Sequence, residues 1–266
     1  MKVLKILNLS FFIIMIAVNF LANLLPLGHG NTGEISVKYE NLFTPAPITF
    51  SIWGVIYILV AVFIIFQLNL FGDNILARKC VELIGIWFIV SCVMNIGWLF
   101  SWHYNIIWLS MIFMLGLLLS LIIIVTRYSP IVVMRETGIE TITFMSRLSF
   151  YAFEVYLGWI TAATIANVSV LLVKLGWNRF GLSSEFWTIL VIIVGAILGM
   201  LFVLSGHRYM SAAAVIWAYC GILIKHISQS GYGGKYPSII AATIVGIIAI
   251  LSTIIINLIL RMGSTT

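Results

Sequence analysis

Residues 43–57, FTPAPITFSIWGVIY, open an apolar segment that continues to residue 70. Its prolines lie where a helix can begin, because proline has a fixed φ and lacks the backbone N–H that the first helical turn leaves unpaired. The apolar part is long enough to cross a ~30 Å hydrocarbon core at ~1.5 Å per residue. We therefore predict a transmembrane helix over residues 47–70 and examine the flanking sequence for others.

Similar apolar segments occur on both sides of this one. Hydrophobic residues make up 62% of the 266 residues and charged residues only 8%, whereas a soluble domain is about 25% charged. No soluble fold could bury this much apolar surface. The sequence predicts an all-α, polytopic transmembrane helical bundle in the lipid bilayer, with eight spans at residues 6–27, 47–70, 81–102, 106–126, 148–173, 185–205, 209–226 and 238–260.

Basic residues indicate the orientation of these spans. The net charge is +6, but Lys and Arg stand singly at the ends of apolar runs, which is not the pattern of a nucleic-acid site. With a cytoplasmic N-terminus, nine of the 14 basic residues fall in cytoplasmic segments and five on the other side. Since positive residues are retained in the cytoplasm, we expect a multi-pass plasma-membrane protein with both termini cytoplasmic.

Three spans carry stripes that mix aromatic rings with hydrogen-bonding groups. Side chains at i, i+3 or i+4, and i+7 share one face of a helix. Interfacial Trp and Tyr, and interhelical Asn and Ser, are common enough to explain any single member. Asn95 and Asn167 differ because they lie well inside their spans. An unsatisfied amide inside a membrane is costly, so we expect both side chains to face the bundle. The stripes are Phe50, Trp53 and Tyr57; Ser91, Asn95, Trp98 and Trp102; and Tyr156, Trp159, Ala163 and Asn167.

Ionisable residues do not suggest a metal site. The histidines lie in loops or at span ends, without a pair at helical ligand spacing, and the three cysteines have no metal-ligand spacing. Glu154, near the edge of its span, allows two interpretations: a proton or ligand contact, or a carboxylate near the headgroups that snorkels or pairs with Arg147.

The motifs in these spans resemble those of the TspO/MBR family, the tryptophan-rich sensory proteins and the translocator protein. FTPAPITFSIWGVIY is similar to the second-helix motif W-x-P-P-x-x-x-F-x-x-x-W-x-x-L-Y, MNIGW (94–98) to the third-helix L-N-x-x-W, and VYLGWITAATIAN (155–167) to the fifth-helix P-Y-x-x-W-x-x-F-A-x-x-L-N. The sequence departs from the family pattern at Leu42, Thr44, Ser91, Val155 and Ala162.

The resemblance covers residues 1–173 and divides the chain in two. It implies a TspO-like five-helix core at residues 1–173, followed by a three-helix transmembrane extension at 174–266 that we interpret as scaffold. In the extension, Gly195 and Gly199 form a G-x-x-x-G pattern, which allows either a homodimer face or close packing within the chain.

A ligand pocket beneath the loop between the first two helices is the functional implication of the resemblance. The family binds porphyrins and, in some members, sterols or drug-like molecules, so a porphyrin or haem is the expected ligand and no cofactor is required. Trp53 and Trp159 fall on the pair implicated in light-dependent porphyrin breakdown and would be catalytic if that reaction occurs here. The implied ligand-binding residues are Phe50, Trp53, Tyr57, Asn95, Trp98, Tyr156, Trp159, Ala163 and Asn167.

Three functional hypotheses follow. The first is a sensory, ligand-binding membrane protein that holds a porphyrin-like or other flat hydrophobic molecule inside the bundle. The alternatives are a transporter or permease-like subunit and a porphyrin-degrading enzyme; charge-poor spans without a buried acidic pair disfavour an ion-coupled carrier. Under the first hypothesis one cavity lies in the outer half of the membrane, roofed by residues 28–46 and lined by Trp53, Asn95, Trp98, Trp159 and Asn167.

Overall fold

The computed structural model describes residues 1–25, 38–39, 41–69, 74–139 and 141–263. Within these ranges every regular element is a helix. Two short 3₁₀ turns, η1 and η2, precede α3 and α9. The elements are α1 (Lys2–Leu24), η1 (Pro47–Ser51), α3 (Ile52–Leu68), α4 (Ile75–Ile84), α5 (Trp87–His103), α6 (Ile107–Arg127), α7 (Pro130–Thr137), α8 (Phe144–Lys174), η2 (Arg179–Gly181), α9 (Ser184–Gly206), α10 (Tyr209–Ile227) and α11 (Pro237–Gly263).

Among the described residues, seven helical segments are long and apolar enough to cross a membrane, and the bent pair α4–α5 gives an eighth. This confirms the all-α, polytopic transmembrane bundle. The helices extend within a few residues of the predicted spans, because length and hydropathy are strong local signals.

The third predicted span, 81–102, is wrong at its beginning. Helix α4 ends at Ile84, α5 begins at Trp87, and their axes differ by 55°. Gly85 between them has φ +57° and ψ −135°, a conformation that L side chains rarely adopt. The segment 127–147, which lies between the fourth and fifth predicted spans, contains the short helix α7, which begins after the N-cap Ser129 and packs against α4.

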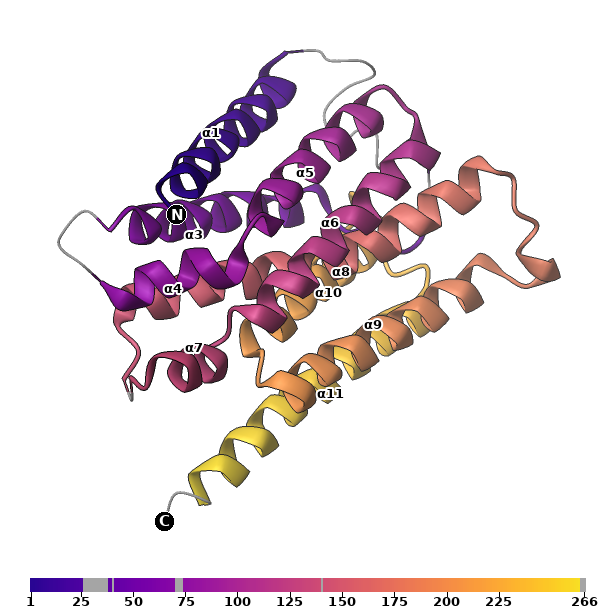
Figure 1. Cartoon of the computed structure of the whole chain (residues 1–266). Coiled ribbons are helices and arrows are strands. Elements are labelled where there is room, and N and C mark those ends of the chain that lie inside the picture. Colours follow the sequence, from indigo (N-terminus) through magenta and orange to yellow (C-terminus); the bar gives the residue numbers. More distant parts are fainter. Residues whose placement is uncertain (26–37, 40, 70–73, 140, 264–266) are drawn as a thin grey trace.

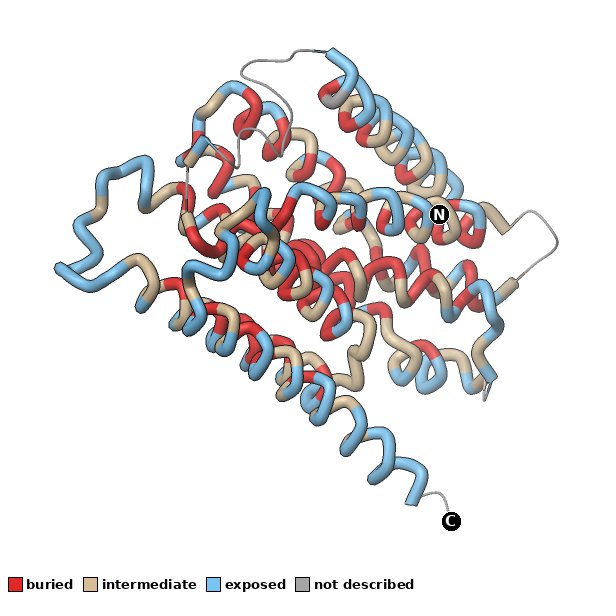
Figure 2. The backbone as a smooth tube through the Cα atoms, turned by 180° about the vertical axis from the view of Figure 1, so that it is seen from behind, coloured by how far each residue is buried: buried red, intermediate tan, exposed pale blue. Residues whose placement is uncertain are grey.

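The helices form two adjoining groups (Figure 1). Helices α1, α3, α5, α6 and α8 make the core, while α9 and α11 run side by side beyond α10, which packs against α8. Buried positions concentrate where the helices face one another, and the free end of α11 is exposed (Figure 2). Exposed apolar side chains are normal where the surrounding solvent is lipid.

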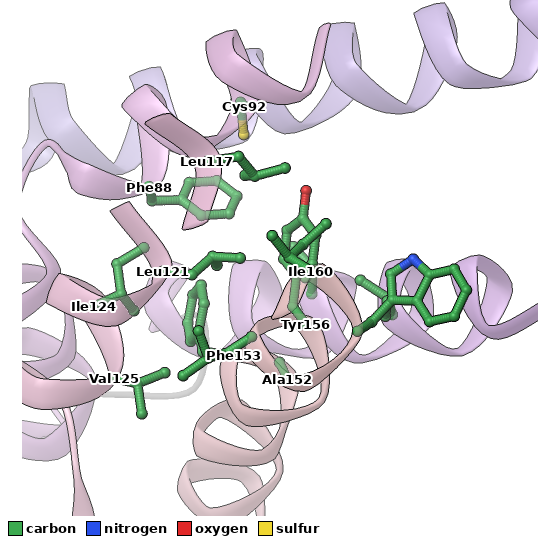
Figure 3. Close-up of a cluster of buried hydrophobic side chains, with 14 of the residues drawn as sticks. Phe88, Cys92, Leu117, Leu121, Ile124, Val125, Ala152, Phe153, Tyr156 and Ile160 are labelled. Carbon is green, nitrogen blue, oxygen red and sulfur yellow. The ribbon is translucent and has the colours of Figure 1, made fainter. Parts of the chain in front are cut away.

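Aromatic side chains fill the part of the core next to α4 and α7. Phe63, Phe88 and Phe153 make edge-to-face contacts with centroid distances of 4.9 to 6.1 Å. This arrangement suits the positive edge and negative face of aromatic rings. Figure 3 shows Phe88 and Phe153 among the buried side chains of this region, with the Tyr156 hydroxyl pointing toward the helix that carries Cys92.

Helix α10 docks on the core through backbone contacts. The Ala46 amide donates to the Gly221 carbonyl at 3.0 Å, and Trp217 Nε1 donates to the Thr49 carbonyl at 2.8 Å. A Cβ on Gly221 would lie 2.0 Å from Thr49 Oγ1, so only glycine permits this approach. The extension is thus built into the core at the segment that begins the second span.

The G-x-x-x-G glycines of α9 pack inside the chain. A Cβ on Gly195 would lie 2.5 Å from the Tyr219 hydroxyl, and one on Gly199 would lie 2.7 Å from Ile250 Cδ1. Both neighbours belong to the extension, on α10 and α11. The pattern therefore brings α9 close to α10 and α11.

Glu154 has a role that neither sequence interpretation anticipated. Its Oε2 accepts a hydrogen bond from the Met210 amide at 3.3 Å, and its backbone carbonyl accepts one from Ser211 Oγ at 2.8 Å. Met210 and Ser211 lie in the first turn of α10, whose N–H groups lack intrahelical partners. Glu154 on α8 thus caps α10 from the neighbouring helix.

Candidate ligand-binding cavity

Trp53 lies at the centre of a contiguous cluster of aromatic rings. Pro47 starts η1, and the chain passes directly into α3, so Phe50 and Trp53 lie one turn apart on the side facing α5 and α8. Trp53 stacks on Tyr57 at 5.5 Å and on Trp98 at 6.1 Å between ring centroids.

The cluster continues onto α5 and α8. Trp53 meets Tyr156 at 5.7 Å and Trp159 at 6.3 Å, both edge to face. Trp159 in turn contacts Phe50 at 5.9 Å, and Trp98 stacks on Trp102 at 5.9 Å. Side chains from three different spans therefore converge.

A cavity of about 50 Å³ lies against this cluster. Its wall is almost entirely apolar, and it includes six of the nine predicted ligand-binding residues: Phe50, Trp53, Trp98, Trp159, Ala163 and Asn167. The other lining residues are Phe43, Pro45, Trp102, Met114, Ala162, Ala166, Ala218 and Ile222.

Asn167 fixes the orientation of one indole in the wall. Its Oδ1 accepts hydrogen bonds from Trp98 Nε1 and from Ser110 Oγ, each at 3.2 Å. Its Nδ2 group lies 3.4 Å from Met111 Sδ. Asn167 is 2% exposed, so its amide is satisfied by protein groups rather than by solvent.

The remaining three predicted residues, Tyr57, Asn95 and Tyr156, lie behind the cavity wall. Asn95 Nδ2 donates to the Tyr156 hydroxyl at 2.9 Å, and Asn95 Oδ1 accepts from Asn19 Nδ2 at 2.8 Å. Tyr57 and Tyr156 both contact the Trp53 ring. These residues support Trp53 from behind and connect α1, α5 and α8.

Trp159 presents an unpaired hydrogen-bond donor. Its side chain is 3% exposed and lines the cavity, and its Nε1 has no hydrogen-bond partner. A buried unsatisfied N–H costs about 1–3 kcal/mol, and a ligand acceptor that reached Nε1 would remove that cost. Because buried polar groups nearly always have a partner, this N–H is a candidate ligand contact.

Sequence reasoning missed several wall residues. Trp102 belongs to a stripe already visible in the sequence, and Phe43 and Pro45 belong to the motif that opens the second span, so spacing could have included all three. Ala218 and Ile222 come from α10 and carry no motif, so only the packing of α10 against the core identifies them.

Two further expectations concern the loop of residues 28–46, predicted to cover the cavity, and metal binding. Phe43 and Pro45 line the cavity from the predicted roof, whereas residues 28–37 and 40 of that loop lie outside the described residues. Within the described ranges no group of three or more His, Cys, Asp or Glu side chains could hold a metal ion.

The family described as TSPO-like protein matches this chain over residues 5–256. The chain belongs to the TSPO-like family. Searches among curated proteins and among solved structures give no significant match.

The family match covers most of the three-helix extension as well as the five-helix core. The motifs that suggest the TSPO-like family end at Asn167, but the match continues through α9 and α10 and most of α11. The region that matches the family therefore includes Ala218 and Ile222, the two α10 residues that line the cavity.

Proposed function

We propose that this TSPO-like membrane protein binds a flat, largely apolar molecule of the porphyrin type in the cavity beside Trp53. The observation that carries the proposal is the convergence of Trp53, Trp98 and Trp159 on one apolar cavity, and the buried N–H of Trp159, which has no partner, adds to it. Indole faces favour stacking on a flat ring, and a single buried donor fixes its orientation.

Binding requires the cavity to widen. Its 50 Å³ has room for a few water molecules, whereas sites for drug-sized ligands span about 300–1,000 Å³. Phe43 and Pro45 belong to the irregular segment before η1, which is held by fewer regular hydrogen bonds than the helices around it. We infer that this segment moves outward when the ligand enters, while the indoles of α5 and α8 keep their places.

Titration with protoporphyrin tests the proposal. Protoporphyrin added to the purified protein in detergent should quench the tryptophan fluorescence, and the quenching should saturate at one bound porphyrin per chain. Trp159→Phe removes the free donor and part of the ring, so affinity should fall about fivefold, the equivalent of ~1 kcal/mol. The double change with Trp53→Phe should lower it about 25-fold on the same scale.

Trp108→Phe is the matched control, because Trp108 lies on α6 with 59% of its surface exposed. It should leave the affinity unchanged. Equal affinities for the wild type and the double variant would reject the cavity as the porphyrin site, as would an equal loss in the control.

A porphyrin-degrading activity is the second candidate function. Trp53 and Trp159 line the same cavity with centroids 6.3 Å apart, so one ligand could touch both rings. Illumination of the protein–porphyrin complex should then bleach the porphyrin absorbance faster than illumination of the Trp53→Phe complex at equal occupancy. Equal bleaching rates at equal occupancy would leave binding as the function.

A further inference from the structure

A second, larger concavity lies between α8 and α9, at the end of the bundle where residues 175–183 connect them. It has a volume of about 910 Å³, within the range of ligand sites. We call it the α8–α9 groove. Its floor is mainly apolar, with Val168 and Leu172 of α8 and Val191 and Val194 of α9, and it also includes the hydroxyl side chains of Thr164, Ser169 and Thr188.

The mouth of the groove is positively charged and aromatic. Arg179 and Lys235 line it, together with Ser184 at the start of α9 and the rings of Trp177 and Trp187. The two indoles meet at a centroid distance of 4.7 Å. Aromatic rings at this position are typical of the boundary between hydrocarbon and headgroups.

The cations at the mouth are available to an anion. Within the described ranges neither Arg179 nor Lys235 forms an ion pair, and the one described carboxylate at this end of the bundle, Glu185, accepts a hydrogen bond from Ser238. Arg179 Nη1 donates to Ser184 Oγ at 2.6 Å, which leaves its other N–H groups available.

The backbone of this connection is arranged to present the arginine. Arg179 and Phe180 have φ values of 59° and 52°, in the left-handed region that costs energy for residues other than glycine. Trp187 Nε1 donates to the Arg179 carbonyl at 2.9 Å and thereby holds this conformation. Helix α9 begins beside it; Glu185 in its first turn offsets the positive end of the helix dipole, so the attraction for an anion rests on Arg179 and Lys235.

We propose that the α8–α9 groove binds one anionic phospholipid, with its phosphate at Arg179 and Lys235 and an acyl chain along Val168, Leu172 and Val191. The apolar floor and cationic mouth match the two parts of such a lipid. A free anion would gain nothing from the floor, and a neutral lipid would gain less from the mouth. This site is separate from the aromatic cavity, although Phe43 contributes to the walls of both.

Native mass spectrometry of the full chain in detergent tests the proposal, with phosphatidylglycerol and phosphatidylcholine of identical acyl chains as probes. The wild type should retain one phosphatidylglycerol in preference to phosphatidylcholine. Arg179→Gln with Lys235→Gln should weaken phosphatidylglycerol retention about 25-fold, from about fivefold per cation.

The matched control is Lys38→Gln with Lys225→Gln, which removes two cations from the same side of the membrane but outside the groove lining. It should retain phosphatidylglycerol like the wild type. Val191→Trp, which keeps both groove cations and fills the floor, should lose the lipid as well.

The proposal would be overturned by equal retention of the two lipids, by an equal loss in the control pair, or by retention in the Arg179 and Lys235 variant at the wild-type level. Displacement of the lipid by inorganic phosphate at equal concentration would also overturn it, since the floor would then contribute nothing. Size-exclusion profiles and helical circular dichroism of each variant separate loss of lipid from loss of fold.

Discussion

Replacing Gly158 with alanine should separate the extension from the core. The added Cβ would lie 2.1 Å from the backbone oxygen of Ser211 on α10, and contacts under 3.0 Å are not tolerated. A carbonyl oxygen cannot rotate aside as a side chain can, so α8 and α10 must move apart. The hydrogen bonds that Met210 and Ser211 donate to Glu154 would lengthen with that movement.

The expected cost follows from these contacts. Overpacking costs about 1–3 kcal/mol, and two weakened hydrogen bonds add about 0.5–1.5 kcal/mol each if lost. The higher helix propensity of alanine offsets up to ~1 kcal/mol. We expect a net destabilisation of about 2–3 kcal/mol, which for a soluble chain of this size lowers the Tm by roughly 4–12 °C. Because Ala218 and Ile222 line the aromatic cavity, porphyrin affinity should fall as well.

Thermal unfolding in detergent, followed by circular dichroism and size exclusion, measures this effect. Gly54→Ala is the matched control, since Gly54 is also helical and a Cβ there meets nothing within 4 Å. It should be neutral or slightly stabilising. A Gly158→Ala protein as stable as the Gly54→Ala protein would refute the close contact between α8 and α10.

The remaining predictions concern the topology, the buried hydrogen bond between Asn95 and Tyr156, and the cysteines. Reporter fusions at residues 75 and 137 and at the C-terminus should report cytoplasm and one near residue 35 the opposite side, because nine basic residues against five favour that orientation. Asn95→Leu and Tyr156→Phe should each destabilise the bundle by about 1 kcal/mol, with a double-mutant cycle showing that the effects are not additive. Cys80 and Cys92, both fully buried, should resist maleimide until the protein is denatured; labelling of either in the folded protein would contradict the packing of α4 and α5.

Local sequence patterns predicted the spans and much of the cavity. Hydropathy over a membrane thickness identifies helices well because the backbone has no alternative partner in lipid. The spacing of Trp53, Trp98 and Trp159 placed each indole on an inward face, and Asn167 followed from the cost of an unpaired amide. The stripes did not separate Asn95 and Tyr156, which support the wall, from the residues that line it.

Only the tertiary structure decided which helices meet. The break at Gly85 depends on a backbone conformation that glycine permits but does not require. Ala218 and Ile222 line the cavity because α10 approaches Gly158 and Thr49 closely, although nothing in the local pattern of α10 distinguishes these residues from other apolar ones. In lipid every apolar helix face is equally well solvated, so hydropathy selects no partner, and the choice depends on shape complementarity and hydrogen bonds between residues far apart in the chain.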